Sequence, residues 1–320
     1  MANSLRGSIN ALSASLAPPP MQYNEMSRIL SVLRNEIQPR VRATAIHAFG
    51  SSSNGLWTKS SDADLTMIVP RCNNRPKIVT KLRVVRDWIH KNHQLVGYMD
   101  IVENARIPVL KLRLEESPIA EVDLSINNIS GVENSALVRF WCDYRPDIFI
   151  PLARSIKHWA KNRGINDRSK GTLSTYTILL MIVYVMQSRK VLPRFSQFGK
   201  PNILSIPFDE LNGVERDMPF DINFRDPNCV ENPEIDELFL EFFEIFGDVS
   251  FADGVEIVDG EILTMPTPTG ALVMRCPLTG KDVNVLSSSN WKAIHLEFMR
   301  ANELLRQGKS FEEIVSFISS

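Results

Sequence analysis

Long apolar runs, paired cysteines and an excess of either charge are all missing from this 320-residue sequence. The longest apolar stretch without a charge, residues 178–186, is far shorter than the roughly 20 residues needed to cross a bilayer. The 36 Lys plus Arg nearly balance the 37 Asp plus Glu, which argues against coating nucleic acid through net charge. The four cysteines lie far apart without a CxxC pair, which favours a reducing compartment over a zinc knuckle or disulfide framework. We therefore expect a soluble protein without a membrane partner.

The remaining composition is that of a folded chain. With 44% hydrophobic residues, a sequence of this length forms one large or two modest domains. Charge is unevenly distributed, because residues 71–113 contain ten Lys or Arg and three acids, whereas residues 230–264 contain eleven acids and no Lys or Arg. This polarity predicts a local basic face in the first half of the chain.

The first seventeen residues contain one Arg and no acid, and their apolar residues fall at helical spacing. This composition is compatible with an organellar presequence or with a helical or flexible extension that ends at Pro18. We expect a cytoplasmic location, with a mitochondrial one as the alternative.

Hydrophobic periodicity and turn residues divide the chain into two parts. The first part predicts helices at 24–37 and 77–90, strands at 43–49, 65–69, 98–102, 109–114 and 122–126, and a loop at 50–61. Several strands follow one another without a helix, which predicts an α/β (α+β) unit whose sheet is mixed or antiparallel rather than doubly wound. The second part predicts a mainly helical domain, with helices at 135–144, 148–163, 174–187, 233–246, 291–306 and from 311. The helix at 24–37 could belong to either part.

Two carboxylates stand at the start of the second predicted strand. Asp62 and Asp64 are two residues apart, so a strand presents both to the same side. Two such acids repel each other unless a cation lies between them, and oxygen ligands favour Mg²⁺ or Mn²⁺. Twelve residues earlier, Gly50 and Ser51 form a turn that suits a phosphate, because glycine permits close backbone approach and serine supplies a hydroxyl.

A third acid, Asp123, lies on a later strand between apolar neighbours. An isolated charge there is costly, so we expect it to have a function or a partner. Three carboxylates could hold two metal ions about 4 Å apart, an arrangement that activates a hydroxyl and stabilises a leaving phosphate.

Candidate phosphate contacts also occur in the second half. Lys157 and Lys161 are one helical turn apart, and a triphosphate would relieve their repulsion, although the two residues alone favour a solvated helix face. At residues 171–176, hydroxyls open an apolar helix, and Tyr176 offers a ring that could stack on a base or pack in the core.

The Gly-Ser turn, the Asp-x-Asp strand and the third Asp together resemble the nucleotidyltransferases of the DNA polymerase β superfamily. The resemblance implies that Asp62 and Asp64 bind both metal ions, and that Asp123 binds the catalytic one and helps to deprotonate an attacking 3′-hydroxyl. The segments "KHWAK", "GIN" and "GTLSTY" resemble the terminal uridylyltransferases and non-standard poly(A) polymerases, most closely the compact trypanosomal uridylyltransferases. This resemblance covers residues 40–300 and implies substrate contacts from Gly50, Ser51, Ser61, Asn134, Ser135, Lys157, Lys161, Thr175 and Tyr176.

The same resemblance implies a division of the chain. Residues 1–40 form an extension and helix on the helical domain, residues 41–135 the catalytic domain, and residues 136–320 a base-recognition domain with the poly(A)-polymerase-associated region. We expect a monomer, which could join a larger RNA-processing complex. The acceptor is a single-stranded RNA 3′ end in a basic groove, for which Lys81, Arg83 and Arg86 are candidates by composition.

Base choice depends on a departure from the family pattern. The family has an Asp-Pro-Phe segment followed by residues that contact the base, whereas residues 276–282 here are Cys-Pro-Leu-Thr-Gly-Lys-Asp. Asp282 could accept the N3–H of uracil, so we expect UTP as the donor, with ATP as the alternative. A DxD glycosyltransferase and an inactive RNA-binding homologue are rival functions, but neither explains the turn, the three acids and the paired lysines together.

Overall fold

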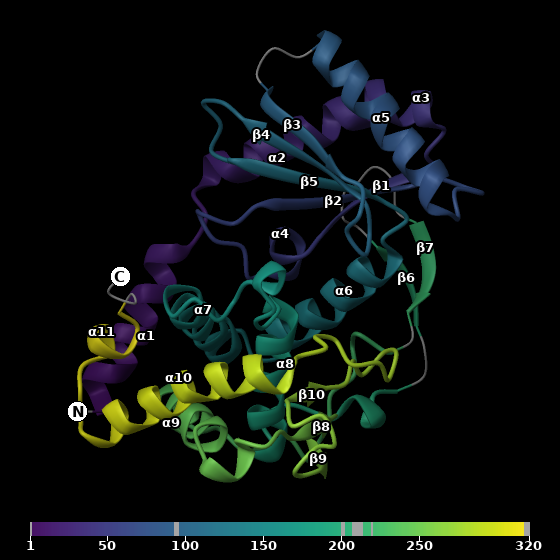
Figure 1. The fold of residues 1–320 in the computed structure, drawn as a ribbon. Helices are drawn as coiled ribbons and strands as arrows, with labels where there is room; N and C mark the ends of the chain where they lie inside the picture. Colours follow the sequence, from purple (N-terminus) through teal and green to yellow (C-terminus); the bar gives the residue numbers. More distant parts are fainter. Residues whose placement is uncertain (1, 93–95, 200–201, 207–213, 219, 317–320) are drawn as a thin grey trace. The chain divides into compact units, whose positions relative to one another are not determined.

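The computed structural model describes residues 2–92, 96–199, 202–206, 214–218 and 220–316. Contacts divide the chain into two units (Figure 1). The sheet unit comprises residues 16–142 and 201–218, and the helical unit comprises residues 1–15, 143–200 and 219–320. Residues 16–40, which include the helix that the sequence left unassigned, lie in the sheet unit.

A five-stranded sheet forms the centre of the sheet unit. Its strands are β1 (Ala45–Phe49), β2 (Ala63–Ile68), β3 (Val96–Val102), β4 (Val109–Leu114) and β5 (Glu121–Ile126). They lie in the order β1-β2-β5-β4-β3, with β2 and β5 parallel and the other pairs antiparallel. The mixed sheet expected from the sequence is confirmed.

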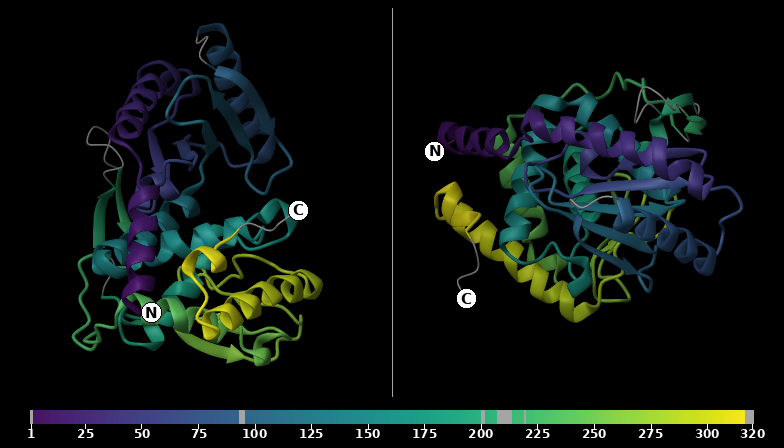
Figure 2. Two further views of the ribbon diagram at one scale, coloured as in Figure 1. Left: turned by 90° about the vertical axis from the view of Figure 1, so that its left-hand side faces the viewer. Right: turned by 90° about the horizontal axis from the view of Figure 1, so that it is seen from above.

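The two faces of this sheet differ in polarity because side chains alternate along each strand. One face is apolar and includes Leu65, Met67, Val122, Leu124 and Leu110, all buried. It packs against α2 (Pro20–Val32), the π-helix η1 (Leu33–Ile37), α3 (Gln38–Val41) and α5 (Arg75–Asn92), which Figures 1 and 2 show on one side of the sheet. The other face is left to polar side chains.

Two local expectations for the sheet unit were wrong. The loop predicted at 50–61 contains the one-turn helix α4 (Ser51–Asn54), because the Asn54 N–H bonds back to the Gly50 carbonyl. Helix α6 (Ile129–Tyr144) starts six residues before the predicted 135, where the Asn128 side chain accepts the Gly131 N–H at 3.1 Å. A hairpin of β6 (Asn202–Ile206) and β7 (Val214–Met218) was not predicted.

The helical unit is built around aromatic side chains. Its helices are α1 (Ala2–Leu16), α7 (Pro146–Asn162), α8 (Thr175–Ser188), α9 (Ile235–Phe246), α10 (Ser288–Arg306) and α11 (Phe311–Ile314). The last residue of α1, Leu16, is assigned to the sheet unit. Short 3₁₀ helices lie at Arg168–Lys170, Phe195–Gln197 and Val249–Phe251. Trp159 of α7 packs on Phe243 of α9 and Phe298 of α10, with ring centroids 4.7 and 4.9 Å apart. None of the described helices is long and apolar enough to cross a membrane.

Two parts of this unit lie outside the predicted helices. A small sheet is formed by β8 (Glu256–Val258), β9 (Glu261–Thr264) and β10 (Val273–Met274), whose strands are too short for a periodic pattern. Helix α1 is ordered against the rest of the unit, because Ile9 is fully buried and Arg6 forms ion pairs with Glu234 and Asp236 at 2.9 and 3.1 Å.

Candidate active site

The polar face of the sheet brings two of the predicted carboxylates together. Strands β2 and β5 are adjacent and parallel, and Asp64 pairs directly with Asp123, so both side chains emerge on the same face. Asp62 lies just before β2, two residues from Asp64, and is exposed. Two carboxylates separated by 59 positions in the sequence therefore lie side by side on neighbouring strands, and Asp62 is two residues from the first of them.

A cation that the sequence analysis missed lies among these acids. Lys111 of β4 is opposite Asp123 on β5, and its ammonium contacts both carboxylate oxygens of Asp123, at 3.0 and 3.1 Å. Burial by itself lowers the pKa of Lys111, but the bond to Asp123 and the charges of Asp123, Glu121 and Asp62 outweigh it and raise this pKa. Lys111 is therefore a fixed positive charge near both Asp62 and Asp123, and it is the partner that the charge of Asp123 required.

Gly50 is packed against Asp64. Its φ of 66° is unfavourable for residues with a side chain, and a Cβ built on it would lie 2.2 Å from Asp64 Oδ2. Its N–H donates to the Ser135 hydroxyl at 2.7 Å, and that hydroxyl donates to the Gly131 carbonyl at 2.6 Å. Ser135, which the sequence predicted to contact the substrate, is buried. In the structure its hydroxyl instead holds the Gly50 turn beside Asp64.

The three serines after Gly50 differ in their hydrogen bonds. The hydroxyls of Ser52 and Ser53 donate to the carbonyls of Phe49 and Gly50, at 3.0 and 3.3 Å. Within the described part of the chain, the half-buried Ser51 has no such side-chain bond, so its hydroxyl is available to a phosphate. Ser61, at the other end of the loop, instead shares a 2.7 Å hydroxyl contact with Thr58.

Two buried hydroxyl groups form hydrogen bonds on strands β2 and β5 next to the carboxylates. Thr66 and Ser125 pair directly, two residues beyond Asp64 and Asp123 on the same strands. Ser125 donates to the Leu65 carbonyl at 3.1 Å, and Thr66 accepts the Asn128 N–H at 3.0 Å. No sequence motif marks these residues, because their role depends on the pairing of β2 with β5. Asn134, the predicted ribose contact, is half-buried on α6 one residue before Ser135.

The remaining predicted contacts lie in the helical unit. Lys157 is half-buried and Lys161 is exposed near the end of α7, and the Thr175 hydroxyl at the start of α8 lies 3.4 Å from the Asn166 amide. Half-buried Tyr176 places its hydroxyl 3.7 Å from Cys276 Sγ, and its pKa is raised well above the usual 10 by burial and by Cys276. Helix α7, which carries Lys157 and Lys161, and the start of α8 therefore belong to the same unit.

Asp282 lies in a turn that is connected to the same helix start. Its carboxylate accepts the backbone N–H groups of Asn284 and Val285, at 3.1 and 3.2 Å. The Asn284 amide in turn accepts the Ser174 N–H at 2.6 Å and donates to the Thr172 carbonyl at 3.1 Å. Any contact of Asp282 with a base must therefore use the lone pairs that the turn leaves over.

Comparison with known proteins agrees with this geometry. Residues 5–143 match the family described as "Poly(A) RNA polymerase, mitochondrial-like, central palm domain". The poly(A) RNA polymerase GLD2 of Bos taurus is 36% identical over 162 residues, which cover 49% of this chain and 33% of that protein. GLD2-A of Xenopus laevis is 30% identical over 238 residues, or 72% of this chain and 45% of that protein.

Solved structures share the fold of the whole chain. The crystal structure of the Cid1 poly(U) polymerase superposes with a TM-score of 0.79 over 99% of both chains, at 19% identity. The chain is thus similar to the non-standard poly(A) RNA polymerases in sequence, over the palm region of residues 5–143, and to a poly(U) polymerase in fold. It spans less than half the length of the curated relatives just named.

The carboxylate oxygens of Asp62, Asp64 and Asp123 are suitable ligands for divalent cations, although the Lys111 ammonium already contacts Asp123. Across the described residues, no three acidic, His or Cys side chains already stand in a metal-binding arrangement. Both oxygens of Asp123 contact the Lys111 ammonium. The positive charge of Lys111 therefore already lies beside these acids. Asp62, Asp64 and Asp123 are the residues that would hold Mg²⁺ or Mn²⁺.

Replacing Lys111 with methionine should make the site bind Mg²⁺ more readily. We expect the Mg²⁺ concentration for half-maximal activity to fall about three- to tenfold, because a competing cation is removed. Without Mg²⁺ the protein should lose at most about 1 kcal/mol of stability, since the Lys111 side chain is 42% exposed. Titration of activity with Mg²⁺ tests this, and Arg113→Met is the control, because Arg113 pairs with Glu121 two residues further along β4. An unchanged Mg²⁺ requirement in Lys111→Met would contradict the competition.

Proposed function

We propose that this protein transfers a nucleoside monophosphate from an NTP to the 3′-hydroxyl of a single-stranded RNA. The 3′ oxygen forms a bond to the α-phosphorus, and the bond to pyrophosphate breaks. The observation that carries the proposal is the direct pairing of Asp64 with Asp123, two residues from Asp62, around a place already occupied by a cation. Bound Mg²⁺ or Mn²⁺ would neutralise phosphate charge and lower the pKa of the attacking hydroxyl.

The residues of the sheet unit provide the positioning part of this reaction. Asp123 lies where it can accept the proton of the 3′-hydroxyl, while Asp62 and Asp64 hold the positive charge that the triphosphate needs. The Gly50–Ser51 turn brings a backbone and a free hydroxyl to the phosphates, and Ser135 holds that turn in place. Such a site accelerates phosphoryl transfer mainly by orientation and charge neutralisation.

The helical unit supplies the proposed contacts to the rest of the nucleotide. Exposed Lys161, half-buried Lys157 and the exposed hydroxyl of Thr175 provide phosphate contacts, and the ring of Tyr176 provides a surface for the base. Asn134 is proposed to contact the ribose. Ser61 is proposed to contribute at the edge of the Gly50 loop. A monomer in the cytoplasm, or alternatively in mitochondria, stays a prediction.

We propose UTP as the donor because Asp282 is the one acid of residues 276–282, the segment that contacts the Tyr176 hydroxyl through Cys276. A carboxylate accepts the N3–H of uracil, whereas the equivalent ring nitrogen of adenine is itself an acceptor and would be repelled. ATP is the second candidate, since the curated relatives GLD2 and GLD2-A are named poly(A) RNA polymerases, while Cid1 is named a poly(U) polymerase.

Extension of a short single-stranded RNA with each of the four NTPs tests both parts of the proposal. Addition with any NTP in Mg²⁺ or Mn²⁺ supports nucleotidyl transfer, and no addition under any condition contradicts it. Strong preference for UTP supports the role of Asp282. In that case Asp282→Asn, which keeps an oxygen for the turn, should reduce the preference for UTP over ATP about tenfold or more. Preference for ATP in the wild type would instead reject the assigned base contact.

A further inference from the structure

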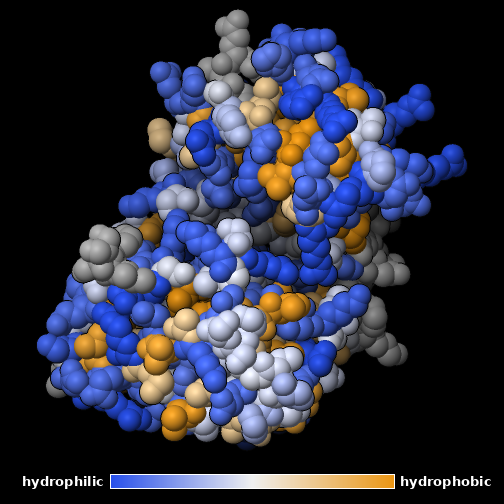
Figure 3. All heavy atoms as spheres, in the orientation of Figure 1, coloured by the Kyte–Doolittle hydropathy of each residue, from blue (hydrophilic) through white to orange (hydrophobic). Residues whose placement is uncertain are grey.

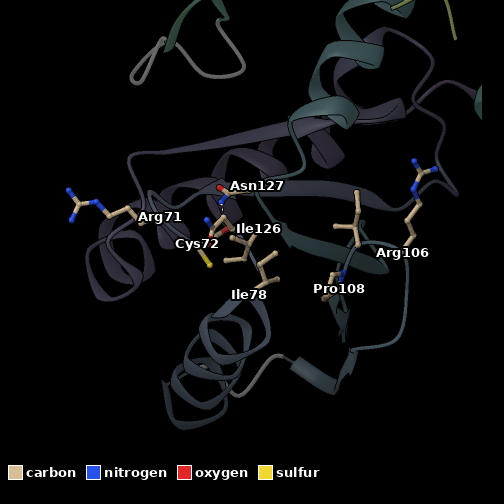
Figure 4. Close-up of a pocket in the computed structure, with 9 residues that line it drawn as sticks. Arg71, Cys72, Ile78, Arg106, Pro108, Ile126 and Asn127 are labelled. Carbon is tan, nitrogen blue, oxygen red and sulfur yellow. Dashed lines mark hydrogen bonds between the residues drawn. The ribbon is translucent and has the colours of Figure 1, made fainter. Parts of the chain in front are cut away.

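A preformed pocket lies in the sheet unit away from the three carboxylates. It has a volume of about 380 Å³, and Cys72, Ile78, Pro108 and Ile126 give it an apolar interior (Figure 4). Asn127 fixes one wall, because its amide donates to the carbonyls of Val69 and Cys72 at 2.9 and 2.8 Å and accepts the Val69 N–H at 2.8 Å. The pocket therefore exists before any ligand binds.

The surroundings of this pocket are basic. Arg71 and Arg106 contribute to its lining, and Figure 4 shows their guanidinium groups extending from opposite sides of it. Lys77 and Lys81 of α5 lie close to the buried Cys72. Burial raises the pKa of the Cys72 thiol, and the charges of Lys81 and Lys77 oppose that rise. No acidic side chain lines the pocket, and Figure 3 shows hydrophilic residues beside an exposed apolar area on this part of the sheet unit.

These cations have no acidic partner, and neither has Arg75, which donates to the carbonyls of Glu103 and Ala105. Arg83 pairs with Glu103 at 2.6 Å and Arg86 with Asp87 at 2.8 Å, so two of the arginines expected to line a basic groove are already neutralised. Among the described residues, Arg71, Lys77, Lys81 and Arg106 form no ion pair. The uncompensated charge of this region is therefore concentrated around the pocket.

The pocket is also near the proposed reaction centre. Asn127 follows Asp123 by four residues at the end of β5, a distance of about 13 Å along the strand. Ile126 and Ile78 of α5 place the pocket at the apolar, helix-covered face, whereas Asp123 emerges on the polar face, so an RNA that occupies both places must pass around the end of β5. At about 3.4 Å per nucleotide, this path takes about four nucleotides or more.

We propose that this pocket and its four unpaired cations bind the acceptor RNA a few nucleotides upstream of its 3′ end. This inference depends on the proposed function. The cations contact the phosphodiester backbone on both sides of the pocket, and the apolar interior receives one base. Such a site lacks hydrogen-bond selection of the base, so it holds RNA of any sequence and favours acceptors long enough to reach it.

The test compares a dinucleotide acceptor with an RNA of about fifteen nucleotides, a length that spans the pocket. In the double variant Arg71→Ala/Arg106→Ala, we expect KM for the longer RNA to rise about five- to tenfold and its salt dependence to weaken by about 1.4 logarithmic units per decade. Addition to the dinucleotide should stay within about twofold of wild type, because the dinucleotide does not reach the pocket. Arg28→Ala/Lys91→Ala removes the same charge from exposed positions outside the pocket lining and should leave both acceptors unaffected.

The outcomes separate the two proposals. If wild type extends neither acceptor, the proposed function fails. If wild type extends both and the Arg71/Arg106 variant changes neither acceptor, or weakens both equally, the pocket does not bind RNA and the inference is overturned. An equal effect of the Arg28/Lys91 variant would also overturn it, since bulk charge would then be sufficient.

Discussion

Replacing Asp123 with alanine is expected to reduce nucleotide addition by about a thousandfold or more, equal to about 4 kcal/mol of transition-state stabilisation. The Asp123 carboxylate is held directly by Lys111, and it faces Asp64 across a parallel strand pair. The variant loses both a metal ligand and the proton acceptor of the proposed mechanism. Single-turnover extension of RNA at saturating Mg²⁺ measures the loss.

The same change should leave the protein folded. Asp123 is only half-buried, and the core beneath it is formed by the opposite face of the sheet. Asp100→Ala is the matched control, because Asp100 pairs with Lys111 from the other side, on β3, and is exposed. Full activity in Asp100→Ala and a normal unfolding temperature in Asp123→Ala would locate the effect in the chemistry. Activity close to wild type in Asp123→Ala would contradict the mechanism.

Replacing Gly50 with alanine is expected to cost about a hundredfold in activity and about 1–2 kcal/mol in stability. Two independent causes act here. The φ of 66° is strained for any residue with a side chain, and the new Cβ would lie 2.2 Å from Asp64 Oδ2. Because a backbone contact to Ser135 holds Gly50, we expect Asp64 to move rather than the turn.

Kinetic and unfolding measurements on a second glycine separate these causes. Gly280 has a φ of 67° and no atom within 4 Å of a built Cβ, so Gly280→Ala reports the strain alone. A loss of stability in both variants, together with a much larger loss of activity in Gly50→Ala, would show that displacement of Asp64 matters. Near-normal addition by Gly50→Ala would mean that Asp64 tolerates another position.

Local patterns were sufficient to predict much of the fold. Strands and helices follow from periods of 2 and 3.6 residues, and the mixed sheet followed from strands that succeed each other without crossover helices. The misses have local causes as well. Helix α6 begins at an asparagine cap where Gly131 interrupts the apolar pattern, and the strands β8 to β10 are too short to show alternation.

The site shows the same division between local and long-range information. The sequence by itself predicted that Asp62 and Asp64 share a side, because alternation is a property of neighbouring residues, and it predicted a turn at Gly50 and Ser51. The tertiary structure decided which strand lies beside β2, and this pairing alone places Asp123 opposite Asp64 and Lys111 opposite Asp123. It also gave Ser135 its contact with Gly50 and assembled the basic pocket from residues 71–78, 106–108 and 126–127. Strand order and register depend on contacts between residues distant in the sequence, and no spacing within a single segment encodes them.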